Sequence, residues 1–215
     1  MGVSRSILHA ERQAFAATLR AVGQDAATLC PPWSAADMAA HVVGGEAAAG
    51  VMSYFPRALV ARGVRLGNNA VIDRGRDALL RRLQRKGFDW ALEQLDAPPP
   101  RLLSRGSPGL VTFFETWVHH EDVRRANDRG PDERADGQLE ACLRFVHRYQ
   151  RRPLSGAVVS VEVPGRERIV LGAGEPAIVL AGPMSEALLW LAGRGAVAHL
   201  DVRGDVATLE PTLRI

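Results

Sequence analysis

The sequence has a single lysine and only two cysteines. The first shortage bears on the genome that encodes the chain, and the second excludes some folds and catalytic mechanisms. Lys86 stands alone among 27 basic residues, and the abundant arginine, alanine and glycine indicate the coding bias of a GC-rich genome. Cys30 and Cys142 lie far apart and form no Cys-x-x-Cys pair, so we expect two reduced packing thiols rather than a disulfide. The sequence therefore predicts neither a disulfide-stapled fold nor a cysteine nucleophile.

Long hydrophobic runs are missing as well. No apolar run approaches the roughly 20 residues that span a bilayer. Glu11 and Arg12 interrupt the stretch where a signal peptide would be apolar. We expect no membrane partner and a cytoplasmic location. With 215 residues and 47% hydrophobic content, the chain can build one large domain or two small ones around a real core.

The charge balance gives little support to nucleic-acid binding. The net charge is only +3, and the arginines are scattered among acidic residues. A phosphate-binding glycine-rich loop is also missing, because Gly172-Ala-Gly174 lacks the strand, glycine and helix context of a nucleotide fingerprint. We therefore predict no nucleic-acid partner.

Apolar residues spaced by three and four predict helices in the first 150 residues. Gly23 is expected to end the first helix, and Ser34 with Asp37 forms a capping-box pattern that starts the second. Gly87 is a candidate bend in the third helix. The expected helices cover residues 4–22, 34–55, 73–95, 108–127 and 136–150, with a long crossover over 57–71.

The pattern changes after residue 155 to short valine-rich and isoleucine-rich runs bounded by glycine or proline, which are typical of strands. Gly204-Asp205 is expected to form a hairpin turn. The expected strands cover 158–163, 169–171, 178–180, 196–202 and 206–209, with one helix over 183–192. We therefore predict an α+β protein, with a helical domain over residues 1–152 and a small α/β domain over 153–215.

Glu115 is a lone carboxylate in an otherwise apolar or neutral helical run, 110–118. Burying an ionised glutamate there costs several kcal/mol unless it is paired, and a divalent cation is one of the few partners that fits. His119 lies four residues later, on the same helix face. His41 occupies a run of small and apolar residues in the second predicted helix, so it is another ionisable group directed inward.

If the second and fourth helices pack side by side, His41, Glu115 and His119 can converge as metal ligands in the core of a bundle. Two histidines and one carboxylate leave coordination positions open, which suits Zn²⁺, with Fe²⁺ or Ni²⁺ as alternatives. A hydrogen-bonded core triad without a metal uses the same residues. The residue types leave both interpretations open.

Several neighbouring residues are weaker candidates. Glu46, on the second predicted helix, is a candidate general base. His120 points about 100° away from His119, so we expect it to support the site from behind or to lie on the surface. Asp122 and Glu121 can orient a ligand imidazole, or they can be solvated acids near a helix end.

The segment His119–Ala126, which reads His-His-Glu-Asp-Val-Arg-Arg-Ala, resembles a family signature. The other segments that carry the resemblance are Glu11-Arg12, Gly23–Ala26, Trp33-Ser34, Asp37–Val43 and Glu186–Arg194. Over nearly its whole length, the sequence is similar to the mycothiol-dependent maleylpyruvate isomerase-like family. The resemblance implies a DinB-like metal-binding four-helix bundle followed by a small α/β domain.

The resemblance also implies roles for particular residues. A histidine on the second helix and a Glu-x-x-x-His on a later helix hold a divalent metal in this family, and these roles fall on His41, Glu115 and His119. An arginine from the C-terminal domain reaches the metal pocket, and Arg194 fits that position, although a helix-end charge is the alternative. We expect Arg194 to bind the thiol or the substrate.

The resemblance implies an enzyme with small-molecule partners. It would use a divalent metal, usually zinc, and mycothiol as a cosubstrate for isomerisation or S-transfer on a small electrophilic substrate. Two alternative functions would use the same three metal ligands. One is a metal-stabilised binding or regulatory module, for which Asp122 or Glu46 could supply a fourth ligand. The other is a metal-dependent hydrolase.

Overall fold

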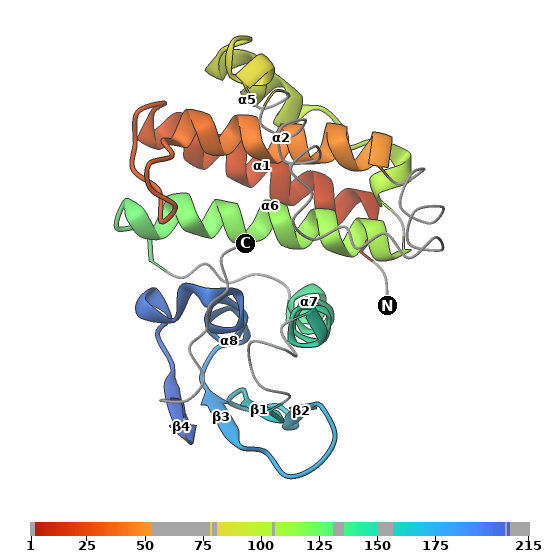
Figure 1. Cartoon of the computed structure of the whole chain (residues 1–215), viewed down its shortest axis with the longest axis vertical. Helices are drawn as coiled ribbons and strands as arrows, with labels where there is room; N and C mark the ends of the chain where they lie inside the picture. Colours follow the sequence, from red (N-terminus) through yellow and green to blue (C-terminus); the bar gives the residue numbers. More distant parts are fainter. Residues whose placement is uncertain are drawn as a thin grey trace. The chain divides into compact units, whose positions relative to one another are not determined.

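The computed structural model describes residues 3–52, 78, 81–104, 106–130, 136–149, 157–204 and 206. The chain divides into two compact units, Gly2–Arg129 and Gly130–Ile215 (Figure 1). Helices dominate the first unit and a small sheet lies in the second, so the fold is α+β. None of the described helices is long and apolar enough to cross a membrane.

The described part of the first unit contains four helices of two or more turns. They are α1 (Arg5–Val22), α2 (Ala35–Met52), α5 (Phe88–Asp96) and α6 (Gly106–Ala126), and a short 3₁₀ turn, Arg101–Ser104, precedes α6. Both α1 and α2 pack against α5 and α6. Figure 1 shows α1, α2 and α6 running alongside one another. This arrangement places one face of α6 against α1 and another against α2.

Local signals fix the ends of the first two helices. The Ser4 hydroxyl accepts a hydrogen bond from Ile7 N at 3.3 Å, and Gly23 ends α1 with a φ of 90°. At the start of α2, Asp37 N donates to Ser34 Oγ at 3.3 Å and Ser34 N donates to Asp37 Oδ2 at 3.0 Å. These reciprocal bonds form the predicted capping box.

Gly87 divides the third predicted helix more sharply than a bend would. Its φ of 90° separates the helical residues 81–84 from α5. A left-handed backbone is easy for glycine and interrupts the helical hydrogen bonds. Most of the predicted residues 73–80 and the predicted crossover over 57–71 lie outside the described part of the chain.

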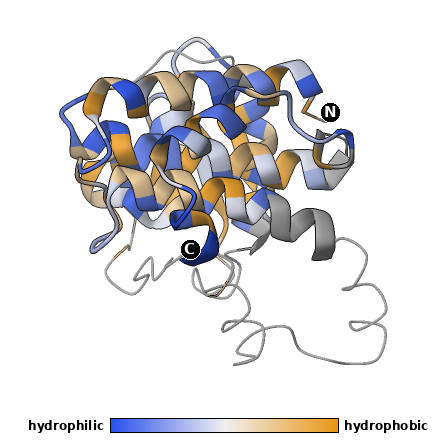
Figure 2. Cartoon of the chain, turned by 90° about the horizontal axis from the view of Figure 1, so that it is seen from above, coloured by the Kyte–Doolittle hydropathy of each residue, from blue (hydrophilic) through white to orange (hydrophobic). Residues whose placement is uncertain are grey.

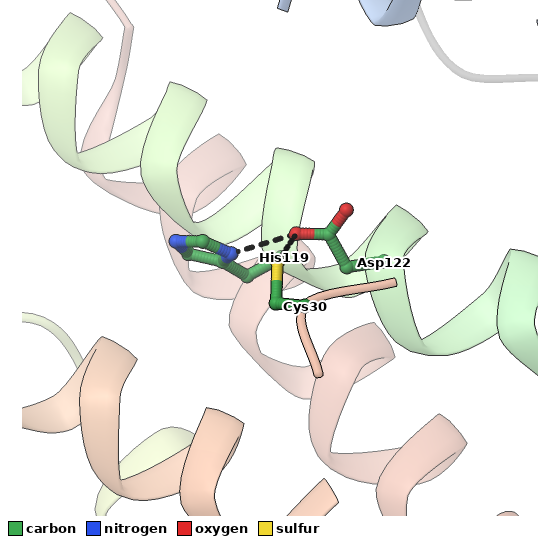
Figure 3. Close-up of side chains that lie close together, drawn as sticks. All are labelled: Cys30, His119 and Asp122. Carbon is green, nitrogen blue, oxygen red and sulfur yellow. Dashed lines mark hydrogen bonds and ion pairs between the residues drawn. The ribbon is translucent and has the colours of Figure 1, made fainter. Parts of the chain in front are cut away.

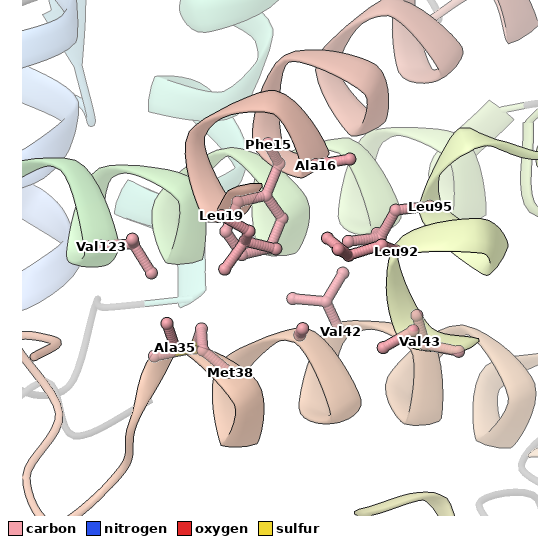
Figure 4. Packing of buried hydrophobic residues seen from close by; sticks show 12 residues of the cluster. Phe15, Ala16, Leu19, Ala35, Met38, Val42, Val43, Leu92, Leu95 and Val123 are labelled. Atoms are coloured by element: carbon pink, nitrogen blue, oxygen red, sulfur yellow. The ribbon is translucent and has the colours of Figure 1, made fainter. Parts of the chain in front are cut away.

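The core of the first unit is built from apolar side chains of all four helices (Figure 4). Phe15 and Leu19 from α1, Met38 from α2, Leu95 from α5 and Val123 from α6 are all completely buried. Full burial of each large side chain contributes about 1.5–3 kcal/mol relative to exposure. This packing holds α2 and α6 in a fixed relation, so side chains on their facing surfaces are well positioned.

Hydrophilic residues are interspersed with hydrophobic ones along the bundle helices (Figure 2). Among the described residues of the first unit, six ionisable residues expose at most 5% of their surface: Glu11, Arg12, His119, His120, Glu121 and Asp122. Buried charges are costly unless they are paired or hydrogen-bonded. Their partners therefore locate the polar centres of the bundle.

The second unit combines helix α7 (Asp136–Tyr149) with a four-stranded sheet and helix α8 (Met184–Leu189). Helix α7 packs against α8 and β2, which groups it with the sheet. The chain consequently divides at residue 130, before α7, whereas the loss of helical periodicity predicts a boundary at 152/153. An amphipathic pattern shows that a helix has a buried face but does not show which unit covers it.

The strands of the sheet are β1 (Val159–Glu162), β2 (Ile169–Leu171), β3 (Ile178–Ala181) and β4 (Asp201–Gly204), in the order β2-β1-β3-β4. The central pair β1 and β3 is parallel, and the outer pairs are antiparallel. The prediction of a strand over 196–202 is wrong over 196–200, because Gly195–Val197 forms a 3₁₀ turn and β4 begins only at Asp201. The predicted strand over 206–209 lies outside the described residues except for Val206.

Candidate metal centre

The three predicted ligands lie together where α2 packs against α6. His41, Glu115 and His119 each offer one ligand atom, and these atoms are all within 4.8 Å of one another. The His41 and His119 rings meet edge to face with their centroids 4.9 Å apart. His119 Nε2 lies 3.6 Å from Glu115 Oε2. The structure thus brings together the residues that the sequence singled out.

The Nε2 atom of His119 is buried and has no hydrogen-bond partner. Its 3.6 Å separation from Glu115 is too long for a hydrogen bond. Leaving a buried polar atom unsatisfied costs about 1–3 kcal/mol. A divalent cation beside His41 and Glu115 would satisfy this nitrogen, so the residues present fit a metal ion.

A cavity of about 220 Å³ opens beside these side chains. A water molecule occupies roughly 30 Å³ of liquid, so the cavity has room for a small ligand beside a metal. The Thr112 and Thr116 hydroxyls donate to backbone carbonyls of their own helix. The lining residues are His41, Val42, Gly45, Glu46, Val111, Thr112, Glu115, Thr116 and His119.

The other ring nitrogen of His119 faces a carboxylate. Asp122 is completely buried, and its Oδ2 accepts a hydrogen bond from His119 Nδ1 at 2.9 Å. The same oxygen accepts a bond from the Cys30 thiol at 3.3 Å (Figure 3). Asp122 is therefore the acid that orients the imidazole, the first of the two roles considered from the sequence.

Two sets of residues could hold a cation around His119, because Cys30, His119 and Asp122 also bring their ligand atoms within 4.8 Å of one another. Asp122 already accepts from Nδ1, whereas Nε2 has no partner. We therefore assign the candidate metal to the Nε2 side, with His41 and Glu115. Cys30 and Asp122 lie on the Nδ1 side of the imidazole and support it there.

The electrostatics of His119 favour a positive charge at this position. Burial lowers the pKa of His119, but the hydrogen bond to Asp122 and the nearby Cys30 and Glu115 side chains outweigh this effect and raise the pKa to about 10. A group that attracts a proton this strongly sits in a negative environment. A divalent cation at Nε2 would satisfy the same environment in place of the proton.

Glu46 lines the cavity and is tied to α1. Its Oε2 forms a buried ion pair with Arg12, and its Oε1 is buried without a hydrogen-bond partner. Arg12 also donates to the backbone carbonyls of Gln94 and Leu95 at the end of α5. Burial raises the pKa of Glu46, and the Arg12 charge acts in the opposite direction. Glu46, the candidate base, therefore has one oxygen fixed by Arg12 and one oxygen without a hydrogen-bond partner.

His120 belongs to a separate cluster on the other face of α6. Its Nδ1 lies 2.8 Å from Glu11 Oε1, and its Nε2 lies 2.8 Å from the Thr18 hydroxyl. The ring also packs against Phe15. His120 is consequently buried against α1 rather than exposed, and it does not reach the candidate metal centre.

The remaining predicted residues lie elsewhere. Glu121 forms ion pairs with Arg124 and Arg125 on its own helix. Arg194 lies in the second unit, directly after Gly193, and its Nη1 donates to the Ala192 carbonyl at 2.7 Å. Its role toward thiol or substrate stays a prediction.

Sequence reasoning missed three residues that contact the site. Arg12 pairs with Glu46, Cys30 bonds to Asp122, and the Trp33 ring lies 4.7 Å from the His41 ring. One available signal was the position of Arg12 on the apolar face of α1, four residues after buried Leu8. Cys30 and Trp33 lie in the connection between α1 and α2, where periodicity carries no information.

A family model described as the mycothiol maleylpyruvate isomerase N-terminal domain matches residues 8–124, more than half of the chain. The chain belongs to this family. The match runs from α1 through most of α6 and includes all three candidate metal ligands. Membership of the mycothiol maleylpyruvate isomerase family confirms the resemblance noted from the His119–Ala126 segment.

Solved structures give the same result for the fold. The crystal structure of the mycothiol-dependent maleylpyruvate isomerase aligns over 92% of this chain and 91% of its own, with a TM-score of 0.60 and 14% identity. A histidine-to-alanine mutant of that enzyme aligns over the same shares with a TM-score of 0.58. These similarities show a shared fold across both units. No curated protein sequence matches the chain.

Proposed function

We propose that this chain is a metal-dependent enzyme that uses a low-molecular-weight thiol, mycothiol, to isomerise a small electrophilic substrate or to join the intact thiol to it through sulfur (S-transfer). The proposed ligands are His41, Glu115 and His119, with Zn²⁺ as the metal and Fe²⁺ or Ni²⁺ as alternatives. The proposed small-molecule partners follow from the family and from the name of the enzyme that shares the fold.

One observation carries the proposal. His119 Nε2 is buried without a partner beside two further ligand groups, at the wall of a cavity of about 220 Å³. Three protein ligands next to an open cavity suit a catalytic metal, which keeps a position for a substrate. A bound divalent cation would lower the pKa of a coordinated thiol and favour its thiolate at neutral pH.

The residues of the chain supply the remaining chemistry. Glu46 Oε1 is an acceptor without a partner in the cavity wall, so it can receive the proton that the thiol releases. Arg12 holds the other oxygen of Glu46 and keeps that side chain in place. We assign to Arg194 the role of binding a carboxylate of the thiol or of the substrate.

The proposed reaction balances without a further reagent. The thiolate sulfur attacks one carbon of an electron-poor alkene, and the alkene electrons move to the electron-withdrawing group. Rotation about the resulting single bond and expulsion of the thiolate then give the other geometric isomer. In the S-transfer version, the adjacent carbon, which received the alkene electrons, takes the proton that the thiol released, and the carbon–sulfur bond remains.

The alternative of a metal that only ties α2 to α6 needs a fourth protein ligand in most cases. Asp122 is bonded to the opposite nitrogen of His119, and one oxygen of Glu46 is paired with Arg12. Neither residue joins the set formed by His41, Glu115 and His119. This arrangement favours a catalytic centre over the structural module.

The test is metal analysis of purified wild type, Glu115→Gln and Glu140→Gln, followed by calorimetric titration with mycothiol and with glutathione. Glu140 is a matched control, because it is a helical carboxylate of the second unit whose partner is Arg144. We expect one metal per chain in wild type and Glu140→Gln, loss of metal in Glu115→Gln, and selective binding of mycothiol.

The other outcomes distinguish the alternatives. Metal without any thiol affinity would overturn the thiol-dependent reaction and favour the hydrolase or the structural module. Full metal content in Glu115→Gln would overturn the assignment of the ligands.

A further inference from the structure

The connection between α1 and α2 supports both candidate histidine ligands, His119 through Asp122 and His41 by direct packing. Cys30 bonds to Asp122, which bonds to His119, and Trp33 packs against His41. The connection is itself attached to α6, because Leu29 N donates to the backbone carbonyl of Asp122 at 3.1 Å. The position of Cys30 relative to Asp122 is therefore fixed by backbone as well as by side-chain contacts.

Further hydrogen bonds hold Cys30 within the connection. Cys30 N donates to the Thr28 hydroxyl at 3.1 Å, and that hydroxyl donates to the Trp33 carbonyl at 2.8 Å. Residues 28–33 thus form a short braced segment. A thiol held in this way presents its hydrogen to a defined oxygen.

The hydrogen bond between His119 and Asp122 determines which nitrogen can bind a metal. An ionised carboxylate only accepts hydrogen bonds, so His119 Nδ1 must carry the hydrogen. The lone pair of a neutral imidazole is then on Nε2, which faces His41 and Glu115. The opposite tautomer would place a lone pair against the carboxylate and lose this bond.

Cys30 acts on the same oxygen. Oδ2 of Asp122 accepts from both His119 Nδ1 and the Cys30 thiol, and Asp122 is completely buried. A second donor on that oxygen fixes the direction of the carboxylate and helps to compensate for its lost hydration. This contact goes beyond the packing role expected for Cys30 from the sequence.

We propose that Cys30 is a positioning residue of the metal centre, which acts through Asp122 to hold His119 with Nε2 directed at the metal. The proposal rests on the proposed metal centre and adds this residue to it. It predicts that the metal affinity depends on a hydrogen-bond donor at position 30, not on sulfur as a ligand.

The test is the zinc affinity of the metal-free full chain, measured by competition with a chromophoric chelator, in wild type, Cys30→Ala, Cys30→Ser, Asp122→Asn and Cys142→Ala. We expect Cys30→Ala to weaken binding about fivefold, the net effect of one hydrogen bond. Asp122→Asn should weaken it about 10- to 100-fold. Cys30→Ser should return to within about twofold of wild type, because its hydroxyl also donates.

Cys142→Ala is the matched control, because it removes the only other cysteine, which is buried on α7 in the second unit. The Co²⁺ absorption spectrum provides a second readout, and it should change in Cys30→Ala and return in Cys30→Ser. Equal zinc affinities in wild type and Cys30→Ala, or a Cys30→Ser variant as weak as Cys30→Ala, would overturn this proposal alone. A wild type that binds no metal would overturn the metal centre as well.

Discussion

Two adjacent histidines of α6 lie in buried clusters with different chemistry. His120 faces α1, where Glu11 and Thr18 provide a partner for each ring nitrogen. His119 faces α2, and Asp122 of its own helix provides a partner for Nδ1, whereas Nε2 has none. Both side chains are almost completely buried, so burial alone does not separate them.

The difference shows how a structural histidine can be distinguished from a candidate ligand. A satisfied network such as the His120 cluster ties two helices together and leaves no group available for a ligand. The His119 cluster has an unsatisfied nitrogen, two neighbouring ligand groups and a cavity. We therefore assign stability to the α1 face of α6 and metal binding to its α2 face.

The largest stability effect should come from Arg12, which links the α1 face to the cavity through Glu46. Arg12→Ala leaves the buried Glu46 carboxylate without its ion-pair partner and removes donors from two carbonyls of α5. We expect the free energy of unfolding to fall by about 3–5 kcal/mol, measured by urea denaturation.

The matched control is Arg20→Ala on the same helix. Arg20 pairs with Asp96, and both side chains are more than 40% exposed. Such surface pairs contribute less than about 1 kcal/mol. An Arg12→Ala variant no less stable than Arg20→Ala would contradict the buried pair as a support of the cavity wall.

A smaller loss is expected for His120→Ala. The substitution leaves Glu11 and Thr18 without their His120 contacts and creates a cavity beside Phe15. We expect about 2–3 kcal/mol of lost stability by urea denaturation. Unchanged stability would show that this cluster does not hold α1 to α6.

Thr18→Val tests one bond of the same cluster. Valine has nearly the shape of threonine but cannot pair with His120 Nε2, so one buried polar atom loses its partner. We expect a loss of about 1 kcal/mol. Thr116→Val is the control and should be close to neutral, because the Thr116 hydroxyl bonds only to a carbonyl of its own helix. Equal losses in the two variants would contradict the pairing.

The two cysteines should differ in reactivity. Burial raises the pKa of Cys142 from its ordinary value of 9.0 to about 12. The native thiol therefore stays protonated between about pH 9 and 12 while the unfolded thiol ionises, so this group makes the folded state less stable as pH rises through that window. At pH 8.5, iodoacetamide should modify half-buried Cys30 first, and mass spectrometry should find Cys142 modified only after unfolding.

Local sequence signals predicted the helix ends of the bundle. The Ser34 and Asp37 capping box and the Gly23 stop depend on residues a few positions apart, so the sequence contains all the necessary information. The prediction of a strand over 196–202 is wrong over its first five residues, because a run of small apolar residues fits a 3₁₀ turn as well as an edge strand. The grouping of α7 with the sheet depended on tertiary packing.

The candidate site could be predicted only in part. Glu115, His119 and His41 stood out as ionisable residues among apolar or small neighbours in predicted helices, and the family resemblance implied the same three ligands. The supporting contacts could not be read from spacing, because Arg12 is 34 residues from Glu46 and Cys30 is 92 residues from Asp122. Buried polar groups require hydrogen-bond or ion-pair partners, but only the packed structure shows which residues those partners are.

The most direct test of the central claim is a zinc titration of metal-free His119→Ala beside His120→Ala, with the folded fraction of each checked by circular dichroism. The account predicts that His120→Ala binds one zinc ion per chain with the affinity of wild type. His119→Ala should bind at least about 100-fold more weakly, because it loses a ligand rather than a supporting contact. Wild-type affinity in His119→Ala, or loss of zinc from a folded His120→Ala, would contradict it.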